Sequence, residues 1–253
     1  MKDAIIFLHG IVGNQSVFAK EMDVLKKNYY CTSYDFYPLK NINLDDSFSL
    51  QAFVDQLYMH YIQMNIKKAH LCALSFGCLI ALSFVQKYPH MVASLTFIGG
   101  YCCNVPSVYH TNLLQLMNRR RQLSYNEWLK ECVRTLNPNR KEILEDSEAI
   151  FLESARLLQP SLFERIVRLN LEVNSEFVLR EVNVPILWIM GEYDELYKGT
   201  LGNLKRYVPH VQYREIKRAG HVAHIHQHLQ FMLIFKRFLR QQSLGKIGLN
   251  PSF

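Results

Sequence analysis

Short apolar runs alternate with amphipathic stretches along most of the chain. Six of the runs are bounded by polar or turn-forming positions, which predicts buried strands. Between them, apolar positions recur every three or four residues, which predicts helices. The predicted strands cover 4–8, 30–34, 69–74, 92–98, 184–190 and 211–216, and the predicted helices cover 15–27, 48–65, 77–87 and 222–240. Strands that alternate with helices predict an α/β fold with a mostly parallel, doubly wound sheet.

Residues 101–180 break this alternation. Their apolar positions keep a helical period, and no strand-like run interrupts them. We therefore expect a helical insertion at 101–180 and a core domain made of residues 1–100 and 181–242. The last residues, 243–253, are punctuated by Gly, Ser and Pro and are expected to form a flexible tail.

The end of the third predicted strand carries the most distinctive chemical pattern. The apolar run from Ala69 to Leu74 stops at Ser75, which has small residues two positions away on each side, Ala73 and Gly77. A helical pattern begins directly afterwards. A serine at the apex of such a tight strand-to-helix turn can meet both a base and a substrate. The alternative is a buried helix that contains Ser-Phe-Gly by chance, and Ala73 stands where the usual pattern has Gly.

Three further segments follow predicted strands. They are His9-Gly10-Ile11-Val12-Gly13-Asn14 after the first strand, Gly191-Glu192-Tyr193-Asp194 after the fifth, and Arg218-Ala219-Gly220-His221 after the last. A candidate nucleophile, acid and base therefore occur in the order serine, aspartate, histidine. That is the order of the catalytic triad in α/β-hydrolases. The chain resembles this superfamily over nearly its whole length.

The resemblance implies a Ser-His-Asp triad. Ser75 is the expected nucleophile, since a serine hydroxyl becomes reactive when a base removes its proton. His221 is the expected base, because imidazole is suited to proton transfer near neutral pH. Asp194 is expected to orient the imidazole and stabilise its charged form. Glu192 and Glu195 flank Asp194 and are the alternatives for the acid.

The family pattern also implies an oxyanion hole and a lid. The backbone N–H groups of Phe76 and Ile11 are expected to bind the developing oxyanion. His9 and Gly10 are expected to structure the loop around Ile11. The helical insertion at 101–180 falls where the family places a lid, between the sixth and seventh strands of its fold. Lids supply substrate shape and exclude water.

The histidine-rich segment from His221 to His228 suggests a metal site as an alternative. His224 and His228 could share one face of a helix. No carboxylate or cysteine lies near in the sequence to complete such a site. We therefore expect no metal, one catalytic histidine, and three others on the first turns of the last helix. There is no GxGxxG after the first strand and no P-loop, so no cofactor is predicted.

Composition narrows the partners and the location. The 253 residues carry a formal net charge of +7, but the basic residues are scattered, with one cluster at Arg119-Arg120-Arg121. No nucleic-acid-binding motif appears, and no apolar run reaches the ~18 residues of a membrane span. The N-terminus leads straight into a predicted strand, so no signal peptide is expected, and the six cysteines form no CxxC pair. We expect a cytoplasmic protein that acts on a small-molecule or carrier-bound acyl substrate.

The segments around Gly191 and Gly220 are similar to the synthase that makes 2-succinyl-6-hydroxy-2,4-cyclohexadiene-1-carboxylate, in a carboxylesterase-like branch of the superfamily. That synthase uses its triad to start an elimination and places an arginine after the nucleophile to hold a substrate carboxylate. Here the matching stretch, Gly77-Cys78-Leu79, has no charge, although arginines of the insertion could serve instead. The first hypothesis is therefore a serine hydrolase that cleaves a carboxylic ester or thioester through an acyl-enzyme. Elimination is the alternative, as is a ligand-binding or signalling role without catalysis.

Overall fold

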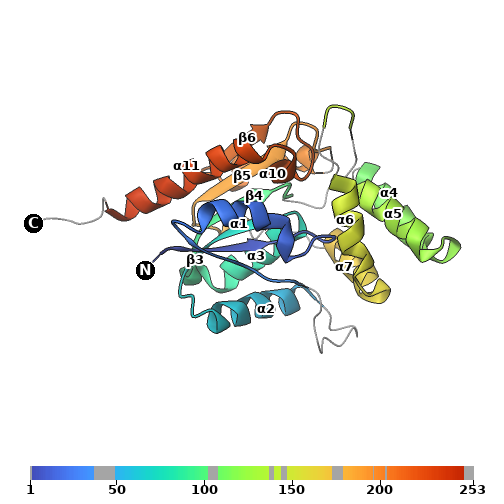
Figure 1. Cartoon of the computed structure of the whole chain (residues 1–253), viewed down its shortest axis with the longest axis horizontal. Helices are drawn as coiled ribbons and strands as arrows, with labels where there is room; N and C mark the ends of the chain where they lie inside the picture. The colour runs from blue at the N-terminus through green and yellow to red at the C-terminus, as the bar shows by residue number, and fades with distance from the viewer. Residues whose placement is uncertain are drawn as a thin grey trace, which may run out of the picture.

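A six-stranded sheet lies at the centre of the computed structural model of the chain (Figure 1). The structure describes residues 2–36, 49–101, 108–136, 140–143, 147–172, 179–195, 197–202 and 204–247. The strands are β1 (Ala4–Leu8), β2 (Tyr30–Ser33), β3 (Ala69–Leu74), β4 (Val92–Ile98), β5 (Ile186–Gly191) and β6 (Gln212–Ile216). Their order is β2-β1-β3-β4-β5-β6, and every neighbouring pair is parallel.

This strand order places helices on both faces of the sheet. The chain runs outward from β1 to β2 and then returns past β1 to β3, so right-handed crossovers put the helices before and after β2 on opposite faces. On one side are η1 (Gln15–Phe18) and α1 (Ala19–Leu25), and on the other are α2 (Leu50–Gln63) and α3 (Phe76–Lys87). The C-terminal helix α11 (His228–Ile247) joins the first side, since Phe18 and Phe235 both pack on Phe7. The predicted doubly wound α/β sheet is confirmed.

All six predicted strands form: three match their predicted bounds, and the ends of the other three shift by one or two residues. β5 begins at Ile186 because Pro185 has no N–H to give to the ladder. The helix predicted over 222–240 is two helices, α10 (Ala223–His226) and α11, separated by Gln227 with φ −138° and ψ 58°. Helix α11 continues to Ile247, so the segment predicted as a tail begins as helix. No proline interrupts the sequence there before Pro251, and 248–253 lie outside the described residues.

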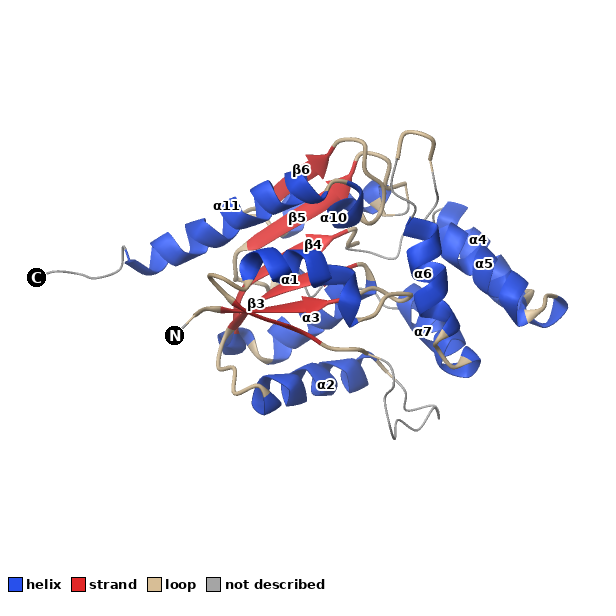
Figure 2. Cartoon of the chain, in the orientation of Figure 1, coloured by secondary structure: helices blue, strands red, loops and turns tan. Residues whose placement is uncertain are grey.

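The described elements between β4 and β5 are all helical (Figure 2). They are α4 (Val108–Asn118), η3 (Arg120–Gln122), α5 (Tyr125–Leu136), α6 (Ser147–Arg156) and α7 (Pro160–Glu172). Trp128 joins three of them, because it donates its indole N–H to the Leu116 carbonyl at 3.0 Å and lies edge-on to Phe163. This helical insertion lies beyond the carboxyl ends of the strands, next to the loops that leave them (Figure 1).

Short helices complete the core. They are η2 (Pro89–Met91), η4 (Lys198–Leu201) and α9 (Leu204–Tyr207). Within the described parts of the chain, no helix combines the length and apolar character needed to cross a membrane.

The parallel sheet gathers the loops after β1, β3, β4, β5 and β6 at one edge, where ligands of open α/β sheets bind.

Candidate active site

Ser75 stands at the turn between β3 and α3. Its backbone has φ 51° and ψ −115°, which a residue with a side chain rarely adopts. Such strain costs about 1–3 kcal/mol and persists only where the surrounding structure imposes it. The Ser75 N–H donates to the Ile98 carbonyl at the end of β4, and the Ser75 carbonyl accepts the Cys78 N–H, both at 2.9 Å. These bonds hold the serine at the carboxyl edge of the sheet.

Gly77 allows helix α3 to start directly against the end of β1. A Cβ atom at this position would lie 2.7 Å from the carbonyl oxygens of both Leu8 and His9. Because those are backbone atoms, no rotation of a side chain could relieve the clash. This close approach is the physical reason for a residue without a side chain two positions after Ser75.

The loops after β5 and β6 bring the predicted acid and base together. Asp194 accepts a hydrogen bond at Oδ2 from His221 Nδ1, at 3.0 Å, and both side chains are buried. A carboxylate can only accept, so the proton of this contact is assigned to Nδ1. In the neutral ring, Nε2 is then left as the acceptor, which is the arrangement that a general base requires.

The two other carboxylates of the β5 loop have different partners. Glu192 accepts the Arg218 N–H at 2.9 Å and pairs with Lys217, and these contacts lower the pKa of Glu192. Glu195 forms an ion pair with Arg140 of the insertion. Of the three acidic candidates, Asp194 is the one that the structure places against His221.

Gly99, which the sequence analysis missed, and Gly191 allow the chain to pack around His221. Gly99, directly after β4, has φ +57°, and a Cβ there would lie 2.7 Å from His221 Cε1 and Nδ1. At the end of β5, a Cβ on Gly191 would lie 2.1 Å from the Gly220 carbonyl oxygen. Glycine at the end of a strand often marks the close approach of another backbone or ring. The Gly99-Gly100 pair after a predicted strand was the signal available in the sequence.

His9 ties the loop after β1 to the chain that follows β2. Its Nε2 accepts the Phe36 N–H at 3.0 Å, so Nδ1 carries the proton and donates to the Gly10 carbonyl at 2.7 Å. The ring also stacks on Phe36, with centroids 3.8 Å apart. Burial lowers the pKa of His9 to about 4. His9 is therefore neutral and fully occupied by the loop, which suits a structural role.

Ser75 and His221 line one small cavity. The remaining walls are Gly10, Ile11, Val12, Leu74, Phe151 and Val222. The cavity volume is about 20 Å³. That is room for one water molecule, whereas small-molecule pockets enclose about 300–1,000 Å³. A substrate larger than its reacting group must therefore extend beyond this cavity.

The two predicted oxyanion donors flank the serine. Phe76 is the first residue of α3, so its N–H has no acceptor within the helix, and the helix N-terminus favours negative charge. Its side chain turns away and packs against Phe36 and Phe53. Ile11 lines the same cavity as Ser75. The structure thus brings Ile11 to the cavity of Ser75, while Phe76 directly follows the serine in the chain.

His226 connects the insertion to the residue before His221. Its Nδ1 accepts the Gly220 N–H at 3.0 Å, which leaves Nε2 to donate to Ser147 Oγ at 2.9 Å. Burial and the nearby charge of His221 lower the pKa of His226 to about 4. The neutral ring therefore joins the start of α6 to the loop after β6.

The other two histidines of this segment have packing and hydrogen-bonding roles. His224 is fully buried and stacks on Phe18, with centroids 4.6 Å apart, and burial lowers its pKa to about 3. His228 forms a 2.9 Å hydrogen bond with the buried Glu21. In the described ranges, no three His, Cys, Asp or Glu residues are arranged so that they could hold a metal ion.

A buried polar network joins α7 to the other side of His221. The Tyr197 ring lies edge-on to His221, with centroids 5.5 Å apart, and Tyr101 stacks on Tyr197. Asn170 of α7 accepts the Tyr101 O–H at its carbonyl, at 2.6 Å, and donates its amide N–H to Tyr197 at 3.2 Å. These residues were not singled out in the sequence, because only the fold brings the three segments together.

Comparisons with known proteins place this geometry in context. A model of the alpha/beta hydrolase fold family matches residues 3–177. The chain is 21% identical to the "Uncharacterized carboxylesterase nap" of Bacillus subtilis (strain 168) over 231 residues, which cover 88% of this chain and 74% of that protein. It is 26% identical to the "Probable lysophospholipase BODYGUARD 2" of Arabidopsis thaliana over 113 residues, or 42% of this chain. That second match spans only about a quarter, 24%, of the plant protein.

Solved structures share the fold at lower identity. A carboxylesterase crystal structure from the thaumarchaeon Nitrososphaera gargenis has a TM-score of 0.81 at 16% identity, covering 96% of this chain and 92% of the other. MenH from S. aureus has a TM-score of 0.75 at 17% identity, covering 95% of this chain and 94% of the other. At these identities, both comparisons show that the fold is shared.

Gly77→Ala should destabilise the protein through its backbone clash. Overpacking of this kind costs about 1–3 kcal/mol or more, and urea unfolding measures it. Gly202→Ala is the matched control, because a Cβ at Gly202 meets nothing within 4 Å. Equal unfolding free energies for the two variants would contradict the role given to Gly77.

The buried histidines predict how stability depends on pH. The pKa values of His9, His224 and His226 are lowered to about 4, 3 and 4. In the unfolded chain histidine titrates near 6.5, so the unfolded state takes up protons first as the pH falls. Above about pH 6.5 these histidines should therefore not lower the unfolding free energy. As the pH falls from about 6.5 to about 4, the unfolding free energy should decrease.

His224→Phe keeps a ring against Phe18 and removes one of these groups. Between pH 7 and 4.5 its unfolding free energy should fall by about 2–3 kcal/mol less than that of the wild type. Urea unfolding at the two pH values measures the difference. If both proteins lose stability equally, burial of a neutral His224 is not the cause.

Proposed function

The chain belongs to the α/β-hydrolase fold family, and on this basis we propose that it is a serine hydrolase that cleaves a carboxylic ester or thioester. The carboxylesterases to which the chain is similar support ester chemistry. The observation that carries the proposal is the His221–Asp194 hydrogen bond beside a cavity that His221 shares with Ser75. Nucleophile, base and acid come from three separate loops that the parallel sheet gathers at one edge.

The proposed reaction proceeds through an acyl-enzyme. His221 Nε2 takes the hydroxyl proton as Ser75 Oγ attacks the carbonyl carbon, and Asp194 stabilises the imidazolium that forms. The N–H groups of Phe76 and Ile11 bind the oxyanion of the tetrahedral intermediate. The intermediate collapses as His221 returns the proton to the departing alcohol or thiol. Water then repeats the sequence on the acyl-Ser75 and releases the acid.

The strained turn suits this chemistry because it fixes the nucleophile before substrate binds. A preorganised hydroxyl loses no further backbone entropy in the transition state. The N-terminus of α3 directly after Ser75 adds a favourable field for the oxyanion. The backbone strain at φ 51° thus occurs at the residue whose hydroxyl has to be positioned.

Elimination of the synthase type is the less favoured reaction. It requires a cation to hold the substrate carboxylate, and Gly77-Cys78-Leu79 supplies none. No arginine or lysine is among the described residues that line the Ser75 cavity. Arg120 of the insertion pairs instead with Glu164 of α7, at 2.7 Å. These observations favour hydrolysis of a substrate without a carboxylate next to the reacting carbon.

The helical insertion is proposed to be a lid that sets acyl-chain preference. Phe151 of α6 reaches the Ser75 cavity, and Leu158, just after α6, lines the neighbouring pocket. Phe163 is fully buried against Trp128 inside the insertion, so it supports the lid without facing either space. A carrier-bound substrate and a cytoplasmic location stay predictions.

Removal of any triad member should abolish most of the turnover of p-nitrophenyl esters. Ser75→Ala and His221→Ala should lower kcat by about 10⁴-fold or more, and Asp194→Asn by somewhat less. Ser75→Ala should leave the unfolding free energy nearly unchanged, because the hydroxyl is not a packing group. His224→Phe is the control histidine. If its loss of kcat equals that of Ser75→Ala while His221→Ala is mild, the base has been assigned to the wrong residue.

Trimming the lid should change the preference between short and medium acyl chains. Phe151→Ala enlarges the space beside Ser75, so it should raise kcat/KM for longer acyl chains relative to acetate by about 10-fold. Phe163→Ala is the control, since it should lower the melting temperature without altering that ratio. An unchanged ratio in Phe151→Ala would make the insertion scaffold only.

A further inference from the structure

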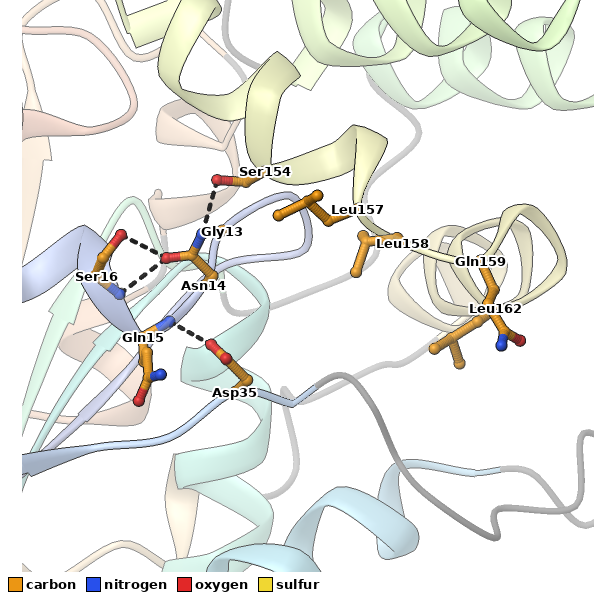
Figure 3. A pocket seen from close by; sticks show the side chains of 10 residues that line it. All are labelled: Gly13, Asn14, Gln15, Ser16, Asp35, Ser154, Leu157, Leu158, Gln159 and Leu162. Atoms are coloured by element: carbon orange, nitrogen blue, oxygen red, sulfur yellow. Dashed lines mark hydrogen bonds between the residues drawn. The ribbon is translucent and has the colours of Figure 1, made fainter.

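A pocket of about 580 Å³ lies between the core and the insertion (Figure 3). Its core wall is formed by Gly13, Asn14, Gln15, Ser16 and Asp35, and its other wall by Ser154, Leu157, Leu158, Gln159 and Leu162. We name this space the core–lid groove. One wall is polar and the other is mainly leucine, so the groove can contact a polar group and an apolar body at the same time.

The walls of the groove continue those of the Ser75 cavity. Gly10, Ile11 and Val12 line the cavity, and the next residues of the same loop, Gly13 and Asn14, line the groove. On the facing side, Phe151 and Ser154 lie one turn apart on α6 and share one face of that helix. Asn14 Nδ2 donates to Ser154 Oγ at 3.0 Å and joins the two walls (Figure 3).

Volume decides where the bulk of a substrate can go. The Ser75 cavity, at about 20 Å³, holds the reacting carbonyl at most. The core–lid groove has the size of a small-molecule site, within the usual ~300–1,000 Å³. With its carbonyl at Ser75, an ester can place one of its two arms in this groove, because the walls of the groove continue those of the cavity.

The charge of the residues that line the groove then decides which arm of the ester fits. Asp35 is the only charged residue among the described residues that line the groove. It is half-buried, and its Oδ1 accepts the Gln15 N–H at 2.5 Å, which fixes the carboxylate on the core wall. In the described chain no ion pair joins Asp35 to a lysine, arginine or histidine, although the protein carries a net charge of +7.

We propose that the core–lid groove binds a positively charged arm of the ester substrate, such as the ammonium group of an amino-alcohol ester. The proposal rests on the hydrolase function proposed above. Asp35 attracts the cation, while Leu157, Leu158 and Leu162 contact the methyl and methylene groups around it. An anionic arm is repelled by the same carboxylate. The groove thereby selects for charge independently of the chemistry at Ser75.

The test compares two esters that differ in one charge. Butyrylcholine and its uncharged carbon isostere, 3,3-dimethylbutyl butyrate, have nearly the same shape. The wild type should show a kcat/KM about three- to fivefold higher for the cation, as expected for a partly exposed ion pair. Asp35→Asn keeps an acceptor for the Gln15 N–H and should bring the ratio near one. Asp35→Glu should retain the preference, and so should Asp55→Asn, which removes the same charge from the exposed surface of α2.

The outcomes separate this inference from the hydrolase proposal. If Asp35→Asn keeps the wild-type ratio, or if the wild type prefers the uncharged ester, the cation site is wrong while Ser75-dependent hydrolysis of the uncharged ester still supports the hydrolase. If neither ester nor p-nitrophenyl butyrate is cleaved in a Ser75-dependent manner, the hydrolase proposal fails and the groove proposal fails with it. Thermal unfolding of each variant confirms that the compared proteins are folded.

Discussion

Helix α3 begins so close to the end of β1 that only a glycine fits between them. A Cβ on Gly77 would lie 2.7 Å from two backbone oxygens, so the contact fixes both the start of the helix and the turn before it. Ser75 is consequently held at φ 51° and ψ −115°. The same contact sets the loop after β1 beside the serine, where His9 and Gly10 keep Ile11 at the cavity. The proposed nucleophile and oxyanion donors are thus positioned by one piece of backbone packing.

Among the described residues, polar contacts between the insertion and the core lie around the site. Ser154 meets Asn14, Ser147 meets His226, Asn170 meets Tyr197 beside His221, and Arg140 pairs with Glu195. A hydrogen bond contributes only about 0.5–1.5 kcal/mol net, so exchanging several of them for water costs little. The small 20 Å³ cavity is therefore compatible with a widening that admits substrate through the core–lid groove. Movement of α6 would enlarge the cavity and the groove together.

Local patterns in the sequence were enough to predict the strands, the sheet type and the positions of Ser75, Asp194 and His221. Each of these residues directly follows a strand, and a parallel sheet gathers such positions at one edge. The close packing around them was not predictable in the same way. Gly99, Tyr197 and Asn170 act through partners far away in the chain, and Asp35 follows a strand without any motif of its own. The interruption at Gln227 was missed because a helical period continues across it.

Fluorophosphonate labelling followed by peptide mapping tests the central claim most directly, since the reagent reacts with a serine that a base and an oxyanion hole activate. The account predicts a single phosphonylated serine, Ser75, in the wild type, and a labelling rate lowered about 10³-fold or more in His221→Ala. Absence of labelling in the folded wild type would indicate a binding protein without this chemistry, and labelling of a different serine would contradict the site described here.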